Sequence, residues 1–437
     1  MKISNWGNYP LIDANIFSPT DDKGIKECIL ASDELIPRGL GRCYGDSSLN
    51  TTIVSMLRMN HFLAFDDING ILTCEAGVSL EEILDVCVSR GWFLSVTPGT
   101  KYVTVGGAIA SDVHGKNHHV AGSFSRHVVS IKIMLSDGTV VRCSDKERQD
   151  LFWSTCGGMG LTGVILEASI RLLKIETAYI RQRIVKSKNI DEAIDLFETN
   201  KHWTYSVAWI DCLAKGNSLG RSALVLGEHA TQDEVGYRYR NPLNIDKKRP
   251  IPVPVYFPNY LLNTYTVKLF NELRYATYIA KDSVVEYEPF FYPLDFIANW
   301  NKIYGKRGFT QYQFVLPKES SREGLKKILT RIAQSGEGSF LAVLKLFGQQ
   351  SGILSFPREG FTLALDFPIT PTTLVLFDEL DAMVADFGGR IYLSKDVRMS
   401  KELFAKGYSA ASQFRDIKKQ FDPLFKFRSL QSKRIGL

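Results

Sequence analysis

Glycine and small hydroxyl residues gather at three places in the first 165 residues of this 437-residue chain. The first cluster runs from Arg38 to Ser48, the second from Pro98 to Gly115 and the third from Gly157 to Gly163. In the first two, an apolar run that predicts a strand leads into the glycines. Glycine permits left-handed backbone angles and lets successive N–H groups converge on a phosphate. We therefore expect the first two clusters to form one anion-binding cradle.

The number of glycine clusters indicates the size of the ligand. No Walker lysine motif is present, which argues against a P-loop nucleotide site. A large, extended dinucleotide needs several close backbone approaches, as three clusters can supply. The segment from His114 to His119 invites a metal interpretation, but its glycine and asparagine oppose the helix that would align the histidines, so we predict no metal.

Composition is that of a soluble globular protein, with 45% hydrophobic and 23% charged residues. The length predicts two domains. No apolar run is long enough to span a membrane, and the amino terminus lacks the apolar core of a signal peptide, so we expect a cytoplasmic protein. The seven cysteines include no Cys-x-x-Cys pair, which favours reduced thiols.

Two basic segments leave alternatives open. From Arg390 to the end, twelve Lys and Arg residues face four Asp and Glu residues, which fits either a solvated helical surface or attraction to a phosphate-bearing ligand or an anionic membrane face. Residues 246–260 contain four prolines after a basic start, which predicts an extended or mobile loop. It is either a plain connector or a segment that rests on lipid or clasps an isoprenoid chain.

The pattern of strands divides the chain. Residues 1–174 end with the strand that follows the third glycine cluster, and residues 396–437 are expected to pack back on that part. Residues 175–395 carry alternating aromatic-rich strands, such as 205–211, 311–315 and 340–347, with amphipathic helices at 322–335 and 373–387. We predict an α+β protein whose second domain is an antiparallel sheet backed by helices.

The motifs resemble those of a known family. Arg-Gly-Leu-Gly-Arg-x-Tyr-Gly-Asp at 38–46, Pro-Gly-Thr-x-x-Val-Thr-Val-Gly-Gly-Ala-Ile-Ala-x-Asp-x-His-Gly-Lys-Asn-His-His at 98–119 and Gly-Leu-Thr-Gly at 160–163 are similar to those of FAD-binding oxidoreductases of the vanillyl-alcohol oxidase type. Within that family they most resemble the decaprenylphosphoryl-β-D-ribose 2′-oxidases. The resemblance covers essentially the whole chain.

The resemblance implies a two-part FAD-binding domain and a non-covalent FAD, because Arg42 stands where covalent members carry a flavin-linked histidine. Its implied cofactor contacts are Arg38, Gly39, Leu40, Gly41, Arg42, Cys43, Tyr44, Gly45, Asp46, Ser47, Gly99, Thr104, Val105, Gly106, Gly107, Ser111, Asp112, Val113, His114, Val164 and Tyr392. Lys395, His114 and Lys345 are its candidate catalytic residues. Its candidate substrate contacts are Lys116, Trp209, Gln311, Gln313 and Lys345.

The implied reaction is oxidation of a sugar secondary hydroxyl to a ketone, at C2 of a polyprenylphosphoryl-β-D-ribose, as the first half of epimerisation to the arabinose form. His114, Lys395 and solvent are the alternative acceptors of the hydroxyl proton. A short-chain reductase would complete the epimerisation, peripheral contact with the inner membrane face would suit the lipid, and no nucleic acid is expected. The alternatives are an oxidase of a small free sugar, such as an aldonolactone or alditol, and a flavin-binding protein without turnover.

Two departures from the family pattern affect the substrate side. Ala364 precedes Leu-Asp-Phe-Pro where mycobacterial members carry a cysteine, so a thiol-directed inhibitor should find no nucleophile there. Phe291 and Tyr292 replace a tyrosine–histidine pair. The substrate pocket is therefore expected to differ.

Overall fold

The first half of the chain builds a six-stranded antiparallel sheet. The protein is described by a computed structural model that covers residues 1–236 and 241–437. Strands lie in the order β10–β9–β11–β7–β6, and β8 pairs with the end of β11. Their bounds are β6 (Phe62–Asp66), β7 (Ile71–Glu75), β8 (Trp92–Leu94), β9 (Val128–Met134), β10 (Val140–Cys143) and β11 (Val164–Lys174). Asp137 and Gly138 form the turn between β9 and β10, as their sequence predicts.

Short helices share one apolar core with this sheet. They are α2 (Leu80–Cys87), α3 (Val105–Ala110), α4 (His118–Ala121) and α5 (Gln149–Thr155). Helix α2 begins at a capping box in which Ser79 and Glu82 each accept from the other's backbone N–H. Its apolar positions then fall on one face and join the core with the strands.

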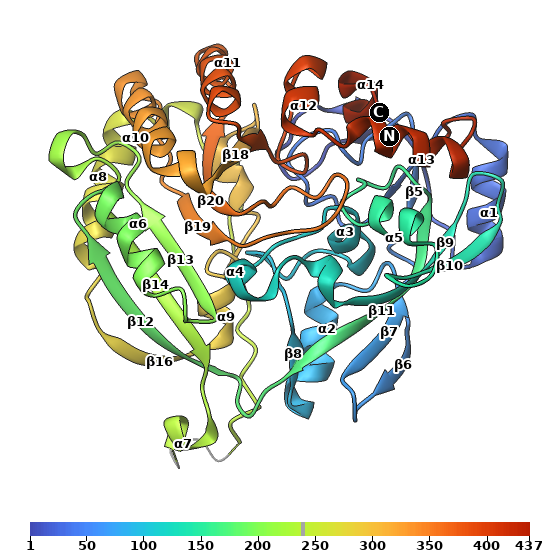
Figure 1. Ribbon diagram of the computed structural model, residues 1–437, viewed down its shortest axis with the longest axis horizontal. Helices are drawn as coiled ribbons and strands as arrows, with labels where there is room; N and C mark the ends of the chain where they lie inside the picture. Colours follow the sequence, from blue (N-terminus) through green and yellow to red (C-terminus); the bar gives the residue numbers. More distant parts are fainter. Residues whose placement is uncertain (237–240) are drawn as a thin grey trace.

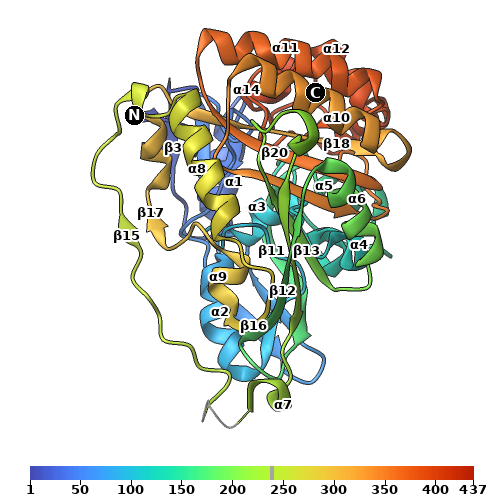
Figure 2. The ribbon, with the colours of Figure 1, turned by 90° about the vertical axis from the view of Figure 1, so that its left-hand side faces the viewer.

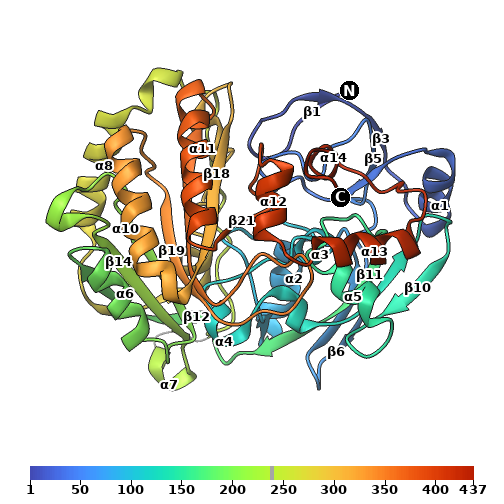
Figure 3. The same cartoon turned by 45° about the horizontal axis from the view of Figure 1, so that its top comes forward.

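A small parallel sheet positions the first glycine cluster. It contains β3 (Asn15–Phe17), β5 (Thr52–Ser55) and β4 (Ile36–Arg38), with α1 (Asp22–Ala31) between β3 and β4, and β1 (Lys2–Ile3) pairs separately with β2 (Ile12–Asp13). The glycines begin where β4 ends, so the sheet fixes the start of the loop. The carboxyl-terminal helices α12 (Lys401–Gly407), α13 (Ala411–Phe421) and α14 (Leu430–Ile435) lie over this half of the molecule (Figure 3).

The second half builds an eight-stranded antiparallel sheet in the order β16–β12–β14–β13–β19–β20–β18–β21. Its strands are β12 (Tyr179–Ser187), β13 (Tyr205–Ile210), β14 (Ser222–His229), β16 (Asp282–Glu286), β18 (Phe309–Pro317), β19 (Ala342–Phe347), β20 (Gly360–Pro368) and β21 (Arg390–Ile391). Helices α6 (Ile190–Thr199), α10 (Lys318–Ser335) and α11 (Pro371–Asp386) pack on one face (Figure 1). Because these helices cover one face, the other face is free to line a site. The predicted α+β class with a helix-backed antiparallel sheet is confirmed.

Residues 241–305 cross from one half to the other. They contain β15 (Ile251–Pro252), α8 (Thr264–Thr277), α9 (Tyr287–Phe291), β17 (Ile297–Ala298) and a 3₁₀ helix at Trp300–Tyr304, while α7 (Gln232–Val235) precedes them. Within the proline-rich segment 246–260, Ile251 and Pro252 are extended and pair in parallel with Ile297 and Ala298. Figure 2 shows this segment running along one flank beside α8.

The two sheets meet where the chain passes from Lys174 to Tyr179. Phe427 forms a bridge with Leu35, so the carboxyl-terminal segment is tied to the first half. We keep the division into 1–174 with 396–437, and 175–395, as a proposal.

Many of the tail's basic residues are engaged internally. Arg434 pairs with Asp46 and Asp396, Arg398 with Asp381, and Lys418 with Asp422. Lys418 is buried and also donates to the carbonyl oxygens of Leu161 and Phe427. Much of the tail's positive charge therefore stabilises the fold instead of facing a partner.

Candidate functional site

A cavity of about 870 Å³ is lined by residues from both halves of the chain. The two glycine clusters form one wall. Residues of β18, β19 and β20, on the face of the large sheet that the helices leave free, form the opposite wall. The β11–β12 connection therefore brings two distant parts of the sequence to one site.

The two predicted glycine segments touch each other. A Cβ atom on Gly39 would lie 2.2 Å from Thr104 Oγ1. Thr104 caps α3, where its Oγ1 accepts from the N–H of Gly107 at 3.2 Å. Gly41 has φ +63°, a backbone conformation that glycine tolerates best. Only glycine at position 39 allows this close approach.

This wall suits the diphosphate of FAD. Within residues 1–236 and 241–437, no backbone or side-chain acceptor takes the N–H groups of residues 39–43. Gly99 has no atom within 4 Å of where its Cβ would stand, so the cavity reaches that backbone. Unpaired N–H groups beside an open cavity form an anion cradle. The residues present therefore fit the cofactor.

Most of the expected cofactor residues line this cavity. They are Arg38, Gly39, Leu40, Gly41, Arg42, Cys43, Tyr44, Ser47, Gly99, Thr104, Gly106, Gly107, Ser111, Val113, His114 and Tyr392. Arg42 lies over the ring of Trp6, with its guanidinium carbon 4.1 Å from the ring centroid. Trp6, which the sequence reading did not select, thus joins the wall.

Five expected cofactor residues are not among those that line the cavity: Gly45, Asp46, Val105, Asp112 and Val164. A Cβ on Gly45 would stand 1.9 Å from the carbonyl oxygen of Asp396, and Asp46 pairs with Arg434 at 2.8 Å. Asp112 accepts from the N–H of Ser125 at 2.9 Å. Val105 and Val164 are fully buried in apolar cores. These residues hold the loops in place.

Three half-buried lysines border the cavity, and only Lys345, on β19, belongs to the wall formed by the large sheet. Lys116, Lys345 and Lys395 all line the cavity. Burial lowers the pKa of Lys345 to about 8. Burial, and then the charge of Lys345, lower the pKa of Lys116 to about 7. Loss of hydration also lowers the pKa of Lys395 to about 7, although Asp366 opposes that shift. The cavity therefore holds three poorly hydrated amines, one on the large sheet and two beside the glycine loops.

Asp366 supports Lys395 and was missed in the sequence. It is fully buried on β20, and its Oδ1 accepts from Gln311 Nε2 at 2.7 Å. Burial raises its pKa to about 7. Lys395 also lies over Tyr44, with its Nζ 3.9 Å from the ring centroid. The sequence does contain an indication of this residue, because Asp366 is the one carboxylate in the otherwise mostly apolar run 361–368.

His114 faces the cavity with one unsatisfied nitrogen. Its Nε2 lies 3.1 Å from Gln313 Nε2, whereas no described group forms a hydrogen bond with its buried Nδ1. Burial, and then the charge of Lys345, hold its pKa well below the usual range, so the ring is neutral. Gln313 also contacts Thr362 Oγ1 at 3.3 Å. Tyr392 donates its hydroxyl to the carbonyl of Ser111 at 2.9 Å, which fixes the loop before His114.

All five residues expected to bind substrate line the cavity: Lys116, Trp209, Gln311, Gln313 and Lys345. Trp209 is held by a hydrogen bond from Nε1 to the carbonyl of Phe340 at 3.2 Å. Ala364 and Phe291 line the cavity too, but Tyr292 points to Thr97, with 2.7 Å between their hydroxyls. Of the two altered positions at 291 and 292, only the first borders the cavity.

The histidines that follow His114 turn apart. His119 Nε2 lies 2.9 Å from the carbonyl of Trp203, and His118 Nδ1 accepts from the N–H of Gly348 at 3.2 Å. In the described part of the chain, no group of three or more His, Cys, Asp or Glu residues is arranged to hold a metal. All seven cysteines are free thiols. Among those same residues, no helix combines the length and apolar character that crossing a membrane requires.

Comparison with known proteins agrees with this geometry. Residues 19–144 match a family model described as an FAD binding domain. The whole chain is 37% identical to decaprenylphosphoryl-β-D-ribose oxidase of Mycolicibacterium smegmatis, over 97% of that protein. It is 32% identical to an uncharacterised protein of Streptomyces coelicolor, over 82% of this chain and all of that protein. A stretch of 142 residues, 32% of this chain and 27% of its relative, is 28% identical to Δ24-sterol reductase of Rattus norvegicus.

Proposed function

Because the chain belongs to the family of FAD-dependent oxidoreductases that includes decaprenylphosphoryl-β-D-ribose oxidase, we propose that it oxidises the C2 hydroxyl of a polyprenylphosphoryl-β-D-ribose to a ketone. FAD supplies two-electron oxidation of a carbinol carbon. The glycine loops at 38–47 and 99–107 would hold it, without a covalent bond at Arg42. The enzyme acts on CH–OH groups.

The cluster of Lys116, Lys345 and Lys395 carries this proposal. Burying three amines in one cavity costs hydration free energy that an anionic ligand can offset. A phosphate-linked sugar brings such charge, whereas a free lactone or alditol does not. The full-length match likewise does not favour the small-sugar alternative.

We assign the remaining polar groups to the sugar. Gln311 and Gln313 present amides that can hold hydroxyl groups, and Trp209 gives an apolar wall that excludes water. The ammonium of Lys395 stabilises negative charge that develops during oxidation. His114 and Lys395 are the alternative acceptors of the hydroxyl proton. Because Gln313 Nε2 donates to His114 Nε2, the neutral ring carries its own hydrogen on Nδ1.

The test is anaerobic mixing of the FAD-loaded protein with a panel of sugars. A prenylphosphoryl ribose should bleach the flavin absorbance near about 450 nm, the band of the oxidised cofactor. Matched arms use the same compound with arabinose in place of ribose, free ribose, an aldonolactone and an alditol. Faster bleaching by any soluble sugar than by the lipid-linked ribose would overturn the substrate assignment.

Two partners follow from the proposed product. A 2-keto sugar needs a hydride to become the arabinose epimer, so we propose a short-chain reductase as its consumer. The lipid part of the substrate resides in a membrane, so we propose peripheral contact with the inner membrane face from the cytoplasmic side.

A further inference from the structure

Helix α8 (Thr264–Thr277) is anchored to the protein by polar contacts as well as by the apolar Val267. Among the described side chains of this helix, only Val267 and Asn271 are buried. Asn271 Nδ2 donates to Asp211 Oδ1 at 3.0 Å, and Tyr275 donates its hydroxyl to the carbonyl of Ser187 at 3.1 Å. An ordinary surface helix buries its apolar stripe. Here polar contacts provide much of the anchoring.

An ion-pair network strengthens that anchor. Arg221 donates to Asp211 at 2.8 Å and pairs with Glu272 of α8 at 2.6 Å. Asp211 lies just after β13, so the network joins the helix to the large sheet. The orientation of α8 is therefore determined by named contacts.

A second stripe of α8 faces the cavity. Phe270, Arg274 and Tyr278, four residues apart, all line it. The ring of Phe270 lies 5.6 Å from that of Phe340, and the ring of Tyr278 lies 6.0 Å from that of Trp209. The helix is thus one wall of the substrate cavity.

The third stripe is apolar and exposed. Tyr265, Leu269 and Leu273 are 85%, 62% and 59% exposed, and their spacing places them on one face of α8. The preceding segment adds further exposed apolar side chains: Val255, Tyr256, Phe257, Tyr260 and Leu261. Exposed apolar side chains gathered on one helix face and the segment before it indicate an interaction site.

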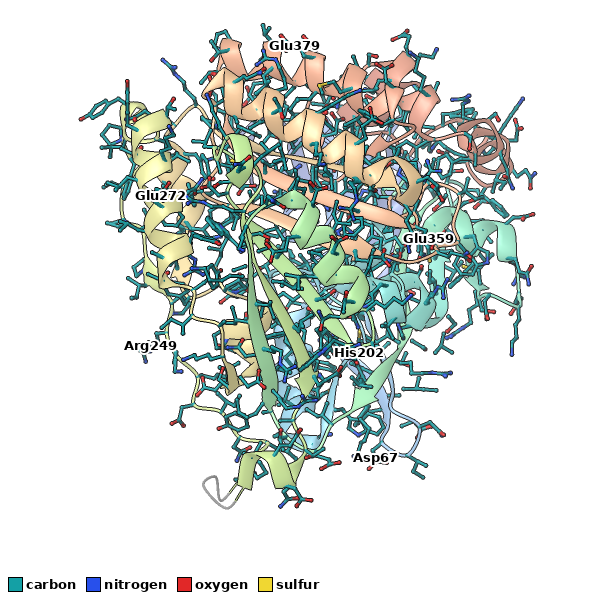
Figure 4. All side chains as sticks on the ribbon, turned by 60° about the vertical axis from the view of Figure 1, so that its left-hand side comes forward. Asp67, His202, Arg249, Glu272, Glu359 and Glu379 are labelled. Atoms are coloured by element: carbon teal, nitrogen blue, oxygen red, sulfur yellow. The ribbon has the colours of Figure 1, made fainter. Side chains whose placement is uncertain are left out.

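The charge around this surface indicates the partner. Residues 246–281 contain six Lys and Arg residues and two acidic ones. Glu272 is paired with Arg221, Lys247 with Asp85 and Lys248 with Glu286, so the excess positive charge rests on Arg249, Lys268, Arg274 and Lys281. Figure 4 shows Glu272 on α8 and Arg249 on the preceding segment at one edge of the molecule. Apolar side chains among basic ones suit a bilayer surface that contains anionic lipid.

We propose that the face of α8 formed by Tyr265, Leu269 and Leu273 inserts into an anionic bilayer surface. This rests on the proposed function, because the same helix borders the cavity with Phe270 and Tyr278. A prenyl chain can then pass from the bilayer along α8 to the cavity without crossing water. The occupant is lipid, not a second protein chain.

Vesicle co-sedimentation of the full-length FAD-loaded protein without substrate tests this. We expect binding to phosphatidylcholine vesicles containing phosphatidylglycerol and weaker binding to phosphatidylcholine alone. The triple variant Tyr265→Ser/Leu269→Ser/Leu273→Ser should lower the partition coefficient about tenfold or more. The matched control is Ile68→Ser, an equally exposed apolar residue on the β6–β7 turn beside Asp67, at a different part of the molecular edge (Figure 4).

Activity on a short-chain, water-soluble prenylphosphoryl ribose separates this idea from the proposed function. The triple variant should keep wild-type turnover there, because its three residues do not line the cavity. Vesicle binding without any sugar oxidation would overturn the function and leave the surface standing. Three results would overturn the proposed membrane contact. They are wild-type protein that does not bind vesicles, light scattering that shows a dimer formed through this face, and a triple variant that binds vesicles as well as wild type does.

Discussion

Gln313 on β18 and His114 on the loop after α3 meet with 3.1 Å between Gln313 Nε2 and His114 Nε2. The contact joins the large sheet to the half that carries the glycine loops. It also sets the tautomer of the neutral ring: the amide nitrogen donates to Nε2, so Nδ1 carries the hydrogen. Both residues are buried, so removing the amide leaves a polar atom without a partner.

Replacement of Gln313 by Leu should therefore lower kcat by about tenfold or more, because an unpaired buried nitrogen costs about 1–3 kcal/mol and frees the ring to rotate. Rapid-mixing measurement of flavin reduction would show the loss. Thr362→Val is the control, since it removes the amide's other partner and leaves the histidine contact intact. Equal losses in both variants would contradict the assigned importance of the Gln313–His114 contact.

Gly39→Ala should weaken both the fold and the FAD site. Its new methyl meets Thr104 Oγ1, and rotation of Thr104 sacrifices the cap of α3, at about 1 kcal/mol. Thermal unfolding and the flavin-to-protein absorbance ratio should both decrease. Gly99→Ala provides the comparison: its methyl meets nothing in the protein, so the apo-protein should unfold at the wild-type temperature while FAD affinity falls. Unchanged FAD affinity in both variants would contradict the assignment of the FAD site to this wall.

The pH dependence of turnover should reveal the role of Lys395. Its pKa is lowered to about 7, so the ammonium is present below that pH and is lost above it. If the ammonium stabilises developing charge, kcat declines as the pH rises from about 7 upward, and Lys395→Met removes the decline along with most activity. Wild-type kcat that instead rises through this range would identify Lys395 as the base.

His229 should make the protein sensitive to acid. It is buried among Phe93, Tyr205 and Phe291, both ring nitrogens lack partners, and burial lowers its pKa to about 4. Because the folded-state pKa lies below the unfolded value of about 6.5, its neutral form contributes stability above pH 6.5 that is lost as the pH falls toward 4. His229→Phe should unfold at a higher denaturant concentration than wild type at pH 4.5, with a smaller difference at pH 8. A constant difference between the two proteins at all pH values would contradict this.

Ala364→Cys should create a reactive position in the cavity. Ala364 lines it, as does the native Cys43, so the test uses a Cys43→Ser background. A maleimide should add one further equivalent and inactivate the FAD-loaded variant, and the Cys43→Ser parent should keep its activity. Failure of the new thiol to react in the folded holoenzyme would place residue 364 outside the accessible cavity.

Local sequence patterns predicted much of one wall. The glycines at 38–47 and 99–107 act through the backbone, so their effect can be predicted from spacing alone. In the structure, Gly39 lies against Thr104 as that spacing requires. The sequence did not distinguish residues of this loop that line the cavity from those that do not. Gly45 and Asp46 belong to the same loop, yet they lie against Asp396 and Arg434. Which side of a loop a residue takes depends on partners from the far end of the chain.

Long-range packing accounts for the remaining differences. Asp366 lies near Lys395 because β18 and β20 pair with each other. Its neighbours in the sequence are apolar strand residues, which give no sign of that position. Arg434 and Lys418 resemble surface charges in the sequence, but in the structure they form ion pairs with the buried carboxylates of Asp46 and Asp422. The exposed face of α8 could not be predicted, because apolar residues at helical spacing normally indicate a buried face. In the structure, the hydrogen bond between Asn271 and Asp211 holds a different face of α8 against the protein.

The most direct test of the central claim is the anaerobic rate of flavin reduction by prenylphosphoryl ribose carrying deuterium at C2. Because the proposed step breaks the C2–H bond, reduction should be slower than with the unlabelled compound, and deuterium at C3 should leave the rate unchanged. An isotope effect at C3 but not at C2, or no flavin reduction by either compound, would contradict oxidation at C2.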